Sequence, residues 1–154
     1  MSDRDDMLRE LYQEVIFDHN RNPRNFHAMA EADHQADGHN PLCGDQLTVY
    51  LRIADGVVQD ASFVGHGCAI STASASLMTE AVKGRPVEEV EALFRDFHAL
   101  LTTSQEGEAP RRDFGKLEVL AGVREFPARV KCATLAWHTL HNAITGAHDT
   151  AHTE

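Results

Sequence analysis

The sequence predicts a single α+β domain over residues 1–154, with helices packed on one face of a small antiparallel β-sheet of about three strands. Apolar residues recur at helical spacing in several segments, and they alternate with polar residues over 47–53. The dipeptide Asp55-Gly56, which follows closely, is a strong hairpin signal. A length of 154 residues suits one domain with a real core. We expect this core to cover about 7–146 and to leave 147–154 as a frayed polar tail.

The first predicted helix lies near the N-terminus. Its apolar residues repeat at helical spacing and are Met7, Leu8, Leu11, Tyr12, Val15 and Ile16. Asp5 or Asp6 can cap its start. It is expected to end before Pro23, because the residue that precedes a proline is pushed out of the helical region. The following segment, 26–41, is expected to be irregular, with a possible short strand at about 31–37.

A β-hairpin is expected next. Its strands are 47–53 and 57–64, joined by the Asp-Gly turn. Asp45 enters the first strand, and Cys68 follows the second. Because these two ends are neighbours in an antiparallel hairpin, we expect Cys43 and Cys68 at the same end of one rigid element.

Two helices are predicted after the hairpin. Cys68 opens the first, over 69–83, and Gly84 is a suitable stop for it. Pro86 is a suitable first-turn residue for the second helix, whose apolar residues continue over 87–101.

The last third of the chain is predicted to hold a loop and two further helices. The segment 102–112 is a polar loop, and 114–121 reads as a short helix stopped at Gly122. The last helix is expected to begin at Cys132 and to end at Gly146.

Composition limits the classes of function. A net charge of −10 argues against a general nucleic-acid binder, whereas it suits solubility and, equally well, a basic partner surface. No apolar run approaches the roughly 20 residues that span a bilayer. The acidic N-terminus is unlike a signal peptide, so we expect a cytoplasmic protein with reduced thiols. Three cysteines cannot all pair internally, which favours metal binding or thiol chemistry.

Four residues stand out as candidate metal ligands: Cys43, Asp45, Cys68 and Cys132. Gly44 gives its loop the freedom to turn Cys43 and Asp45 toward one point. Cys68 and Cys132 are each expected at a helix N-terminus, where free backbone N–H groups favour a thiolate. Three thiolates and a carboxylate suit tetrahedral zinc or an iron–sulfur cluster, and Cys43 is the sulfur expected to do chemistry. The alternative is that the cysteines are small buried apolar residues.

Five stretches of the sequence carry a resemblance to a known family. They are 11–19, 22–25, 40–45, 65–71 and 130–137. Together they resemble the IscU/NifU-N superfamily of iron–sulfur cluster assembly proteins, and the similarity runs over nearly the whole chain. The resemblance implies a SufE/NifU-like α+β fold.

Within that superfamily the chain is similar to the SufU branch. Lys131 stands directly before Cys132, where scaffold-type IscU proteins carry a histidine. The stretch 126–131 differs from the Leu-Pro-Pro-Val-Lys segment that a chaperone reads in those proteins. An extra segment at about 101–115 is also typical of SufU-like proteins.

The resemblance implies a zinc-dependent sulfur acceptor with Cys43, Asp45, Cys68 and Cys132 as the metal ligands. It implies that Cys43 receives persulfide sulfur from a pyridoxal-phosphate-dependent, SufS-like cysteine desulfurase. Docking of the desulfurase is thought to replace Cys43 on zinc with a histidine. The implied partners are this desulfurase and a downstream cluster scaffold, with no nucleic acid and no membrane.

Two other functions remain open at this stage. One is a scaffold on which iron–sulfur clusters are assembled and transferred, and the other is a structural zinc module that recruits partners. Arg129 and Lys131 are candidates for supporting the site or the partner, although Arg129 reads equally well as a surface residue.

Overall fold

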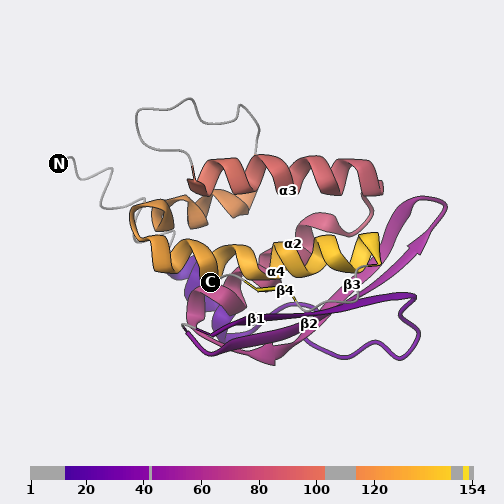
Figure 1. Cartoon of the computed structure of the whole chain (residues 1–154), viewed down its shortest axis with the longest axis horizontal. Helices are drawn as coiled ribbons and strands as arrows, with labels where there is room; N and C mark the ends of the chain where they lie inside the picture. Colours follow the sequence, from indigo (N-terminus) through magenta and orange to yellow (C-terminus); the bar gives the residue numbers. More distant parts are fainter. Residues whose placement is uncertain (1–12, 42, 103–113, 147–150, 153–154) are drawn as a thin grey trace.

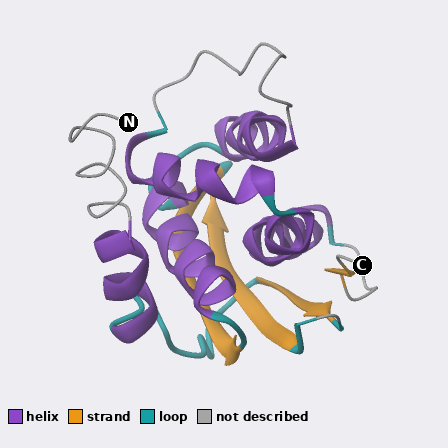
Figure 2. Ribbon diagram, turned by 90° about the vertical axis from the view of Figure 1, so that its left-hand side faces the viewer, coloured by secondary structure: helices purple, strands orange, loops and turns teal. Residues whose placement is uncertain are grey.

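The computed structural model describes residues 13–41, 43–102, 114–146 and 151–152. These residues form an α+β fold in which one sheet carries the helices on one of its faces (Figure 1). Figure 2 shows the strands from a second direction, with helices to either side of them and above them in this view. The predicted fold class is therefore confirmed.

The sheet has the strand order β3-β2-β1-β4. Its strands are β1 (His34–Asn40), β2 (Asp45–Ala54), β3 (Val57–His66) and β4 (Ala151–His152). β2 pairs antiparallel with both β1 and β3, as expected of a small antiparallel sheet. The two-residue β4 pairs parallel with the end of β1, so this part of the tail is ordered rather than frayed.

The first strand lies later in the chain than predicted. The sequence suggested 31–37, whereas β1 begins at His34 and continues to Asn40. Ala36, Gly38 and Asn40 point to the helical side and are buried. A glycine and an asparagine are weak strand formers, and for this reason propensity did not extend the strand to its true end.

The predicted hairpin of β2 and β3 is confirmed. Asp55 and Gly56 both have positive φ, at 55° and 74°, which fits the turn that matches the twist of the two strands. On β2, Leu47, Val49 and Leu51 are buried against the helices, and the residues between them are more exposed.

The helices lie in two levels above the sheet. They are 13–21, α2 (Ala69–Val82), α3 (Val87–Thr102), the 3₁₀ helix η1 (Gly115–Glu125) and α4 (Pro127–Thr145). α2 and α4 lie against the strands, η1 packs on both of these helices, and α3 packs on α4 and η1 (Figure 1). The core includes Trp137 of α4, which is fully buried. Its ring centroid lies 4.8 Å from the ring centroid of Phe97.

Two helix boundaries differ from the predictions. The short helix expected over 114–121 is a 3₁₀ helix that continues through Gly122 to Glu125. The last helix begins at Pro127 rather than at Cys132, because proline is well tolerated in a first helical turn. The start of the first predicted helix and most of the predicted loop 102–112 lie outside the described residues.

Helix α4 approaches β1 unusually closely. A side chain at Gly38 would overlap Thr139 Oγ1 and would touch Leu135 as well. The glycine therefore allows this close packing, and the same run of β1 against α4 brings the end of the strand toward Cys132.

The helix at 13–21 is held to α2 by a buried histidine. His19 is almost fully buried, and its Nδ1 lies 2.7 Å from Ser76 Oγ. Its Nε2 lies 3.6 Å from a carboxylate oxygen of Glu80. The backbone N–H of Arg24 donates to the same hydroxyl at 2.8 Å. Burial lowers the pKa of His19, and Arg24 adds to this effect, so the ring is held neutral.

Candidate metal centre

Cys43 lies in the loop that joins β1 to β2. Asn40 and Asp45 are the last paired residues of the two strands, and four residues separate them. Gly44 has a φ of 69°, a conformation that glycine adopts without strain. The loop leaves Cys43 exposed at the sheet end. Cys43 is therefore the accessible thiol of this loop.

Cys68 caps α2, as the sequence predicted. Its Sγ accepts a hydrogen bond from the backbone N–H of Ser71 at 3.4 Å, and the side chain is half-buried. A thiolate at this position is stabilised by the N-terminal end of the helix.

Cys132 is brought to the same place from α4, but not from the end of that helix. The helix begins five residues earlier, at Pro127, so the expectation of free N–H groups around Cys132 is wrong. The side chain is 2% exposed. Cys132 is therefore a buried thiol whose position depends on the packing of α4 on β1.

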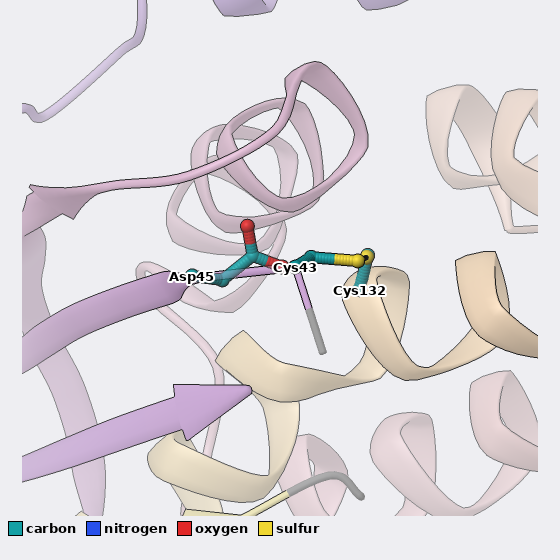
Figure 3. Close-up of side chains that lie close together, drawn as sticks. All are labelled: Cys43, Asp45 and Cys132. Atoms are coloured by element: carbon teal, nitrogen blue, oxygen red, sulfur yellow. Dashed lines mark hydrogen bonds between the residues drawn. The ribbon is translucent and has the colours of Figure 1, made fainter. Parts of the chain in front are cut away.

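Three of the four predicted ligands form a compact group. One ligand atom each of Cys43, Asp45 and Cys132 lies within 4.8 Å of the other two (Figure 3). The sulfurs of Cys43 and Cys132 are 3.1 Å apart. Cys68 lies outside this compact group, although its Sγ is 3.9 Å from Asp45 Oδ2. Residues separated by up to 89 positions thus converge on one point.

The carboxylate of Asp45 is buried and fixed at both oxygens. Its Oδ1 accepts the backbone N–H of Cys68 at 2.7 Å, and its Oδ2 accepts the side-chain amide of Asn40 at 3.4 Å. A Cβ at Gly67 would collide with the same Oδ1. The amide of Asn40 also reaches Cys132 Sγ, at 3.5 Å. These contacts hold the Asp45 carboxylate in one orientation.

Sequence reasoning missed the roles of Asn40 and Gly67. Both were visible in the motifs that hold the cysteines, but only the ligand-type residues were singled out. For Asn40 no local signal was available, because its place opposite Asp45 depends on a strand register that the sequence did not predict. For Gly67 the signal was a glycine directly before a cysteine.

The electrostatics of the site favour a cation. Burial raises the pKa of the Cys132 thiol, and neighbouring Cys43, Cys68 and Asp45 raise it further. Without a cation, the buried Cys132 side chain is therefore favoured as the neutral thiol. Three thiolates and one carboxylate around a divalent ion would leave a charge of about −2 by simple counting. The donor set fits zinc, which prefers sulfur-rich tetrahedral sites.

An apolar groove opens beside the cysteines. It has a volume of about 650 Å³, and its walls include Ile16 and Phe17 from the N-terminal helix, Ile70 from α2 and Val123 from η1. All three cysteines line it. The groove is a route by which another molecule can reach Cys43.

Of the two candidate supporting residues, Arg129 also lines this groove, and its guanidinium lies 4.6 Å from the ring centroid of Phe126. Phe126 is 48% exposed. Lys131 precedes Cys132 on α4 and is not among the residues that line the groove. Of the two, Arg129 is therefore the one placed to meet a molecule in the groove.

Among the described helices, none is both long and apolar enough to cross a membrane.

Comparison with known proteins identifies relatives over most of the chain. The sequence profile of the NifU-like N-terminal domain family matches residues 11–133. The chain is 39% identical over 137 residues to the zinc-dependent sulfurtransferase SufU of Bacillus subtilis, covering 89% of this chain and 91% of that protein. It is also 39% identical over 145 residues to the iron–sulfur cluster assembly scaffold protein IscU of Streptococcus pyogenes, covering 94% and 89%.

A solved structure agrees with these sequence relationships. The N-terminal part of a nitrogen-fixing NifU-like protein from Brucella abortus superposes with a TM-score of 0.78 at 30% sequence identity. The match covers 90% of this chain and 95% of that one.

Proposed function

The chain belongs to the NifU-like N-terminal domain family of iron–sulfur cluster assembly proteins, and we propose that it acts there as a zinc-dependent sulfur acceptor. Its donor would be a pyridoxal-phosphate-dependent cysteine desulfurase, and Cys43 would be the residue that accepts the sulfur. The observation that carries the proposal is the meeting of Cys43, Asp45 and Cys132 at one point, with Cys43 alone of the three exposed.

The proposed zinc ligands are Cys43, Asp45, Cys68 and Cys132. Bound zinc would supply the positive charge that keeps clustered thiols deprotonated at neutral pH, against the effect of burial. The aspartate argues against a purely structural zinc site, because such sites are usually closed by cysteine and histidine. The B. subtilis relative is named as zinc-dependent, which supports the choice of metal.

The proposed chemistry is a thiolate attack on a persulfide. The Cys43 thiolate attacks the terminal sulfur of the desulfurase persulfide, forming a new sulfur–sulfur bond. The old sulfur–sulfur bond breaks, and its electron pair leaves with the desulfurase cysteine as a thiolate. Nothing is oxidised or reduced overall, and one sulfur atom has moved to Cys43. The rate of such a step depends on the thiolate fraction and on access, which suits an exposed loop cysteine.

The apolar groove beside Cys43 is the proposed docking place for the part of the desulfurase that carries the persulfide. Phe17 and Phe126, which are 57% and 48% exposed, provide apolar surface near it. Arg129 would meet an anionic group there, and the persulfide itself is such a group. Lys131 would support the partner at the rim rather than within the groove.

Mass spectrometry tests the proposal. The protein is incubated with a cysteine desulfurase and cysteine, and the site of modification is mapped. A gain of about 32 Da on Cys43, the mass of one sulfur atom, is expected. Cys43→Ala should abolish both this gain and the stimulation of sulfide release, whereas Ser62→Ala, a buried substitution in the middle of β3, should leave both unchanged. Stimulation by Cys43→Ala equal to that of the wild type would refute the carrier role.

A second function is supported by the comparisons. A relative named as a cluster assembly scaffold has the same 39% identity as the zinc-dependent relative. A scaffold would develop visible absorbance after reconstitution with iron and sulfide and would pass its cluster to an apo-acceptor protein. Lys131, in place of the histidine of scaffold-type relatives, counts against this function. Purified protein that keeps about one zinc per chain and resists cluster loading would exclude it.

A further inference from the structure

We propose that Asn40 is a positioning residue that holds Cys132 and Asp45 together as the fixed side of the metal site. This inference rests on the proposed zinc site and deepens it. It assigns a division of labour to the ligands: Cys132 and Asp45 stay in place, while Cys43 is free to exchange.

The position of Asn40 follows from the register of the sheet. Asn40 and Asp45 face each other as the last pair of β1 and β2, and both side chains are fully buried on the helical side. Cys43, in the loop that follows Asn40, is exposed, although its Sγ still lies within 4.8 Å of an Asp45 carboxylate oxygen. One end of the sheet therefore separates a buried pair from an exposed thiol.

One amide group reaches both buried ligands. Asn40 Nδ2 lies 3.4 Å from Asp45 Oδ2 and 3.5 Å from Cys132 Sγ. The close packing of α4 on β1 at Gly38 brings Cys132 within reach of this amide. The amide thus bridges a residue of the sheet and a residue of α4.

The burial of Asn40 is not explained by the carbonyl end of its side chain. Asn40 Oδ1 is buried and has no hydrogen-bond partner among the described residues. A buried unpaired acceptor is unfavourable, so the side chain does not serve stability through this atom. The contribution of this side chain therefore comes from its amide donor, which is directed at Asp45 and Cys132.

The donor has a chemical consequence for the sulfur. A hydrogen bond donated to a thiolate stabilises its negative charge and lowers its nucleophilicity. Cys132 is therefore made a poorer nucleophile and a more permanent ligand than the exposed Cys43. Donors of this kind orient metal ligands, and their loss typically lowers metal affinity by about 10–100-fold.

The test compares four zinc-loaded proteins: wild type, Asn40→Ala, Asn40→Leu and Ser62→Ala. Leucine keeps the approximate size of asparagine without its donor, which separates the donor from simple packing. Ser62 is another fully buried polar residue of the sheet and serves as the matched control. Zinc affinity is measured by competition with a chromophoric chelator. The order in which iodoacetamide modifies the three cysteines is followed by mass spectrometry.

Both Asn40 variants should bind zinc about tenfold or more weakly than the wild type, and Ser62→Ala should match the wild type. In the wild type Cys43 should react first. In both Asn40 variants the modification of Cys132 relative to Cys43 should rise, whereas in Ser62→Ala, which also changes a buried polar residue of the sheet, it should stay at the wild-type level.

Wild-type zinc affinity and an unchanged modification of Cys132 relative to Cys43 in Asn40→Leu would overturn the inference while leaving the proposed function intact. An Asn40 variant that binds zinc weakly but keeps the wild-type modification of Cys132 relative to Cys43 would overturn it as well. A wild-type protein that binds no zinc would instead refute the proposed function, and the role of Asn40 with it.

Discussion

Gly67→Ala is expected to weaken metal binding selectively by displacing the Asp45 carboxylate. The three heavy atoms nearest to a Cβ at this position all belong to Asp45, and Oδ1 is the nearest. That oxygen also accepts the 2.7 Å hydrogen bond from the Cys68 backbone. The added methyl group therefore acts on one side chain and on the hydrogen bond that orients it.

The magnitude follows from that hydrogen bond. A hydrogen bond to a charged group contributes about 1.5–3 kcal/mol. Since about 1.4 kcal/mol corresponds to a factor of ten, the expected loss in zinc affinity is roughly 10- to 100-fold. To bind a metal together with Cys43 and Cys132, the Asp45 carboxylate would have to press against the new methyl group. The substitution therefore destabilises the metal-bound form most.

Chelator competition measures the loss, and Gly122→Ala is the matched control. A Cβ at Gly122, in η1 beside the groove, meets nothing within 4 Å. This variant should bind zinc like the wild type. Equal zinc affinity of Gly67→Ala and Gly122→Ala would refute the reasoning that the space at Gly67 holds Asp45 in place.

Three further predictions concern the fold. Burial lowers the pKa of His19 below its ordinary value of 6.5, so the unfolded chain binds its proton first. The free energy of unfolding should therefore fall as the pH drops below about 6.5, and urea titrations should show a shallower fall in His19→Gln. Gly38→Ala should cost about 1–3 kcal/mol through its overlap with the Thr139 hydroxyl, and Thr139→Ala should recover part of this cost in the same titrations. Phe97→Ala should cost about 3–5 kcal/mol because its ring is fully buried, whereas Phe126→Ala, at an exposed ring, should change the thermal midpoint little. An equal loss from the two phenylalanine changes would contradict the assignment of the core.

The parts of the fold that local chemistry determines were predictable from sequence. The turn at Asp55-Gly56 needs positive φ at both residues, and Asp-Gly is one of the few residue pairs that adopt this conformation readily. The hairpin in turn places Asp45 beside the residues that leave β3, with Gln46 opposite His66. The cap at Cys68 follows from the same geometry.

Boundaries that depend on tertiary packing were not predictable. Pro127 reads equally as the end of a loop and as the first residue of a helix, and the sequence gives no local reason to choose. Gly122 reads as a stop, yet η1 continues past it. The strand β1 contains Gly38, which is explained only by the approach of α4.

The candidate site was predicted in composition but not in its supporting contacts. Cysteine and aspartate are common zinc ligands, so Cys43, Asp45 and Cys132 could be grouped from the sequence by residue type alone. The part of Asn40 depends on a strand register and on a helix more than 90 residues away, since its amide and Cys132 are 92 positions apart. Such a contact carries no local pattern.

Zinc-edge X-ray absorption of the purified protein tests the central claim most directly, because it reports the atoms bound to the metal. We expect one zinc per chain with three sulfur neighbours at about 2.3 Å and one oxygen neighbour at about 2.0–2.2 Å. Each single change of Cys43, Cys68 or Cys132 to serine should remove one sulfur from this set. A wild-type spectrum with fewer than three sulfurs, or the same sulfur count in all three variants, would contradict the account.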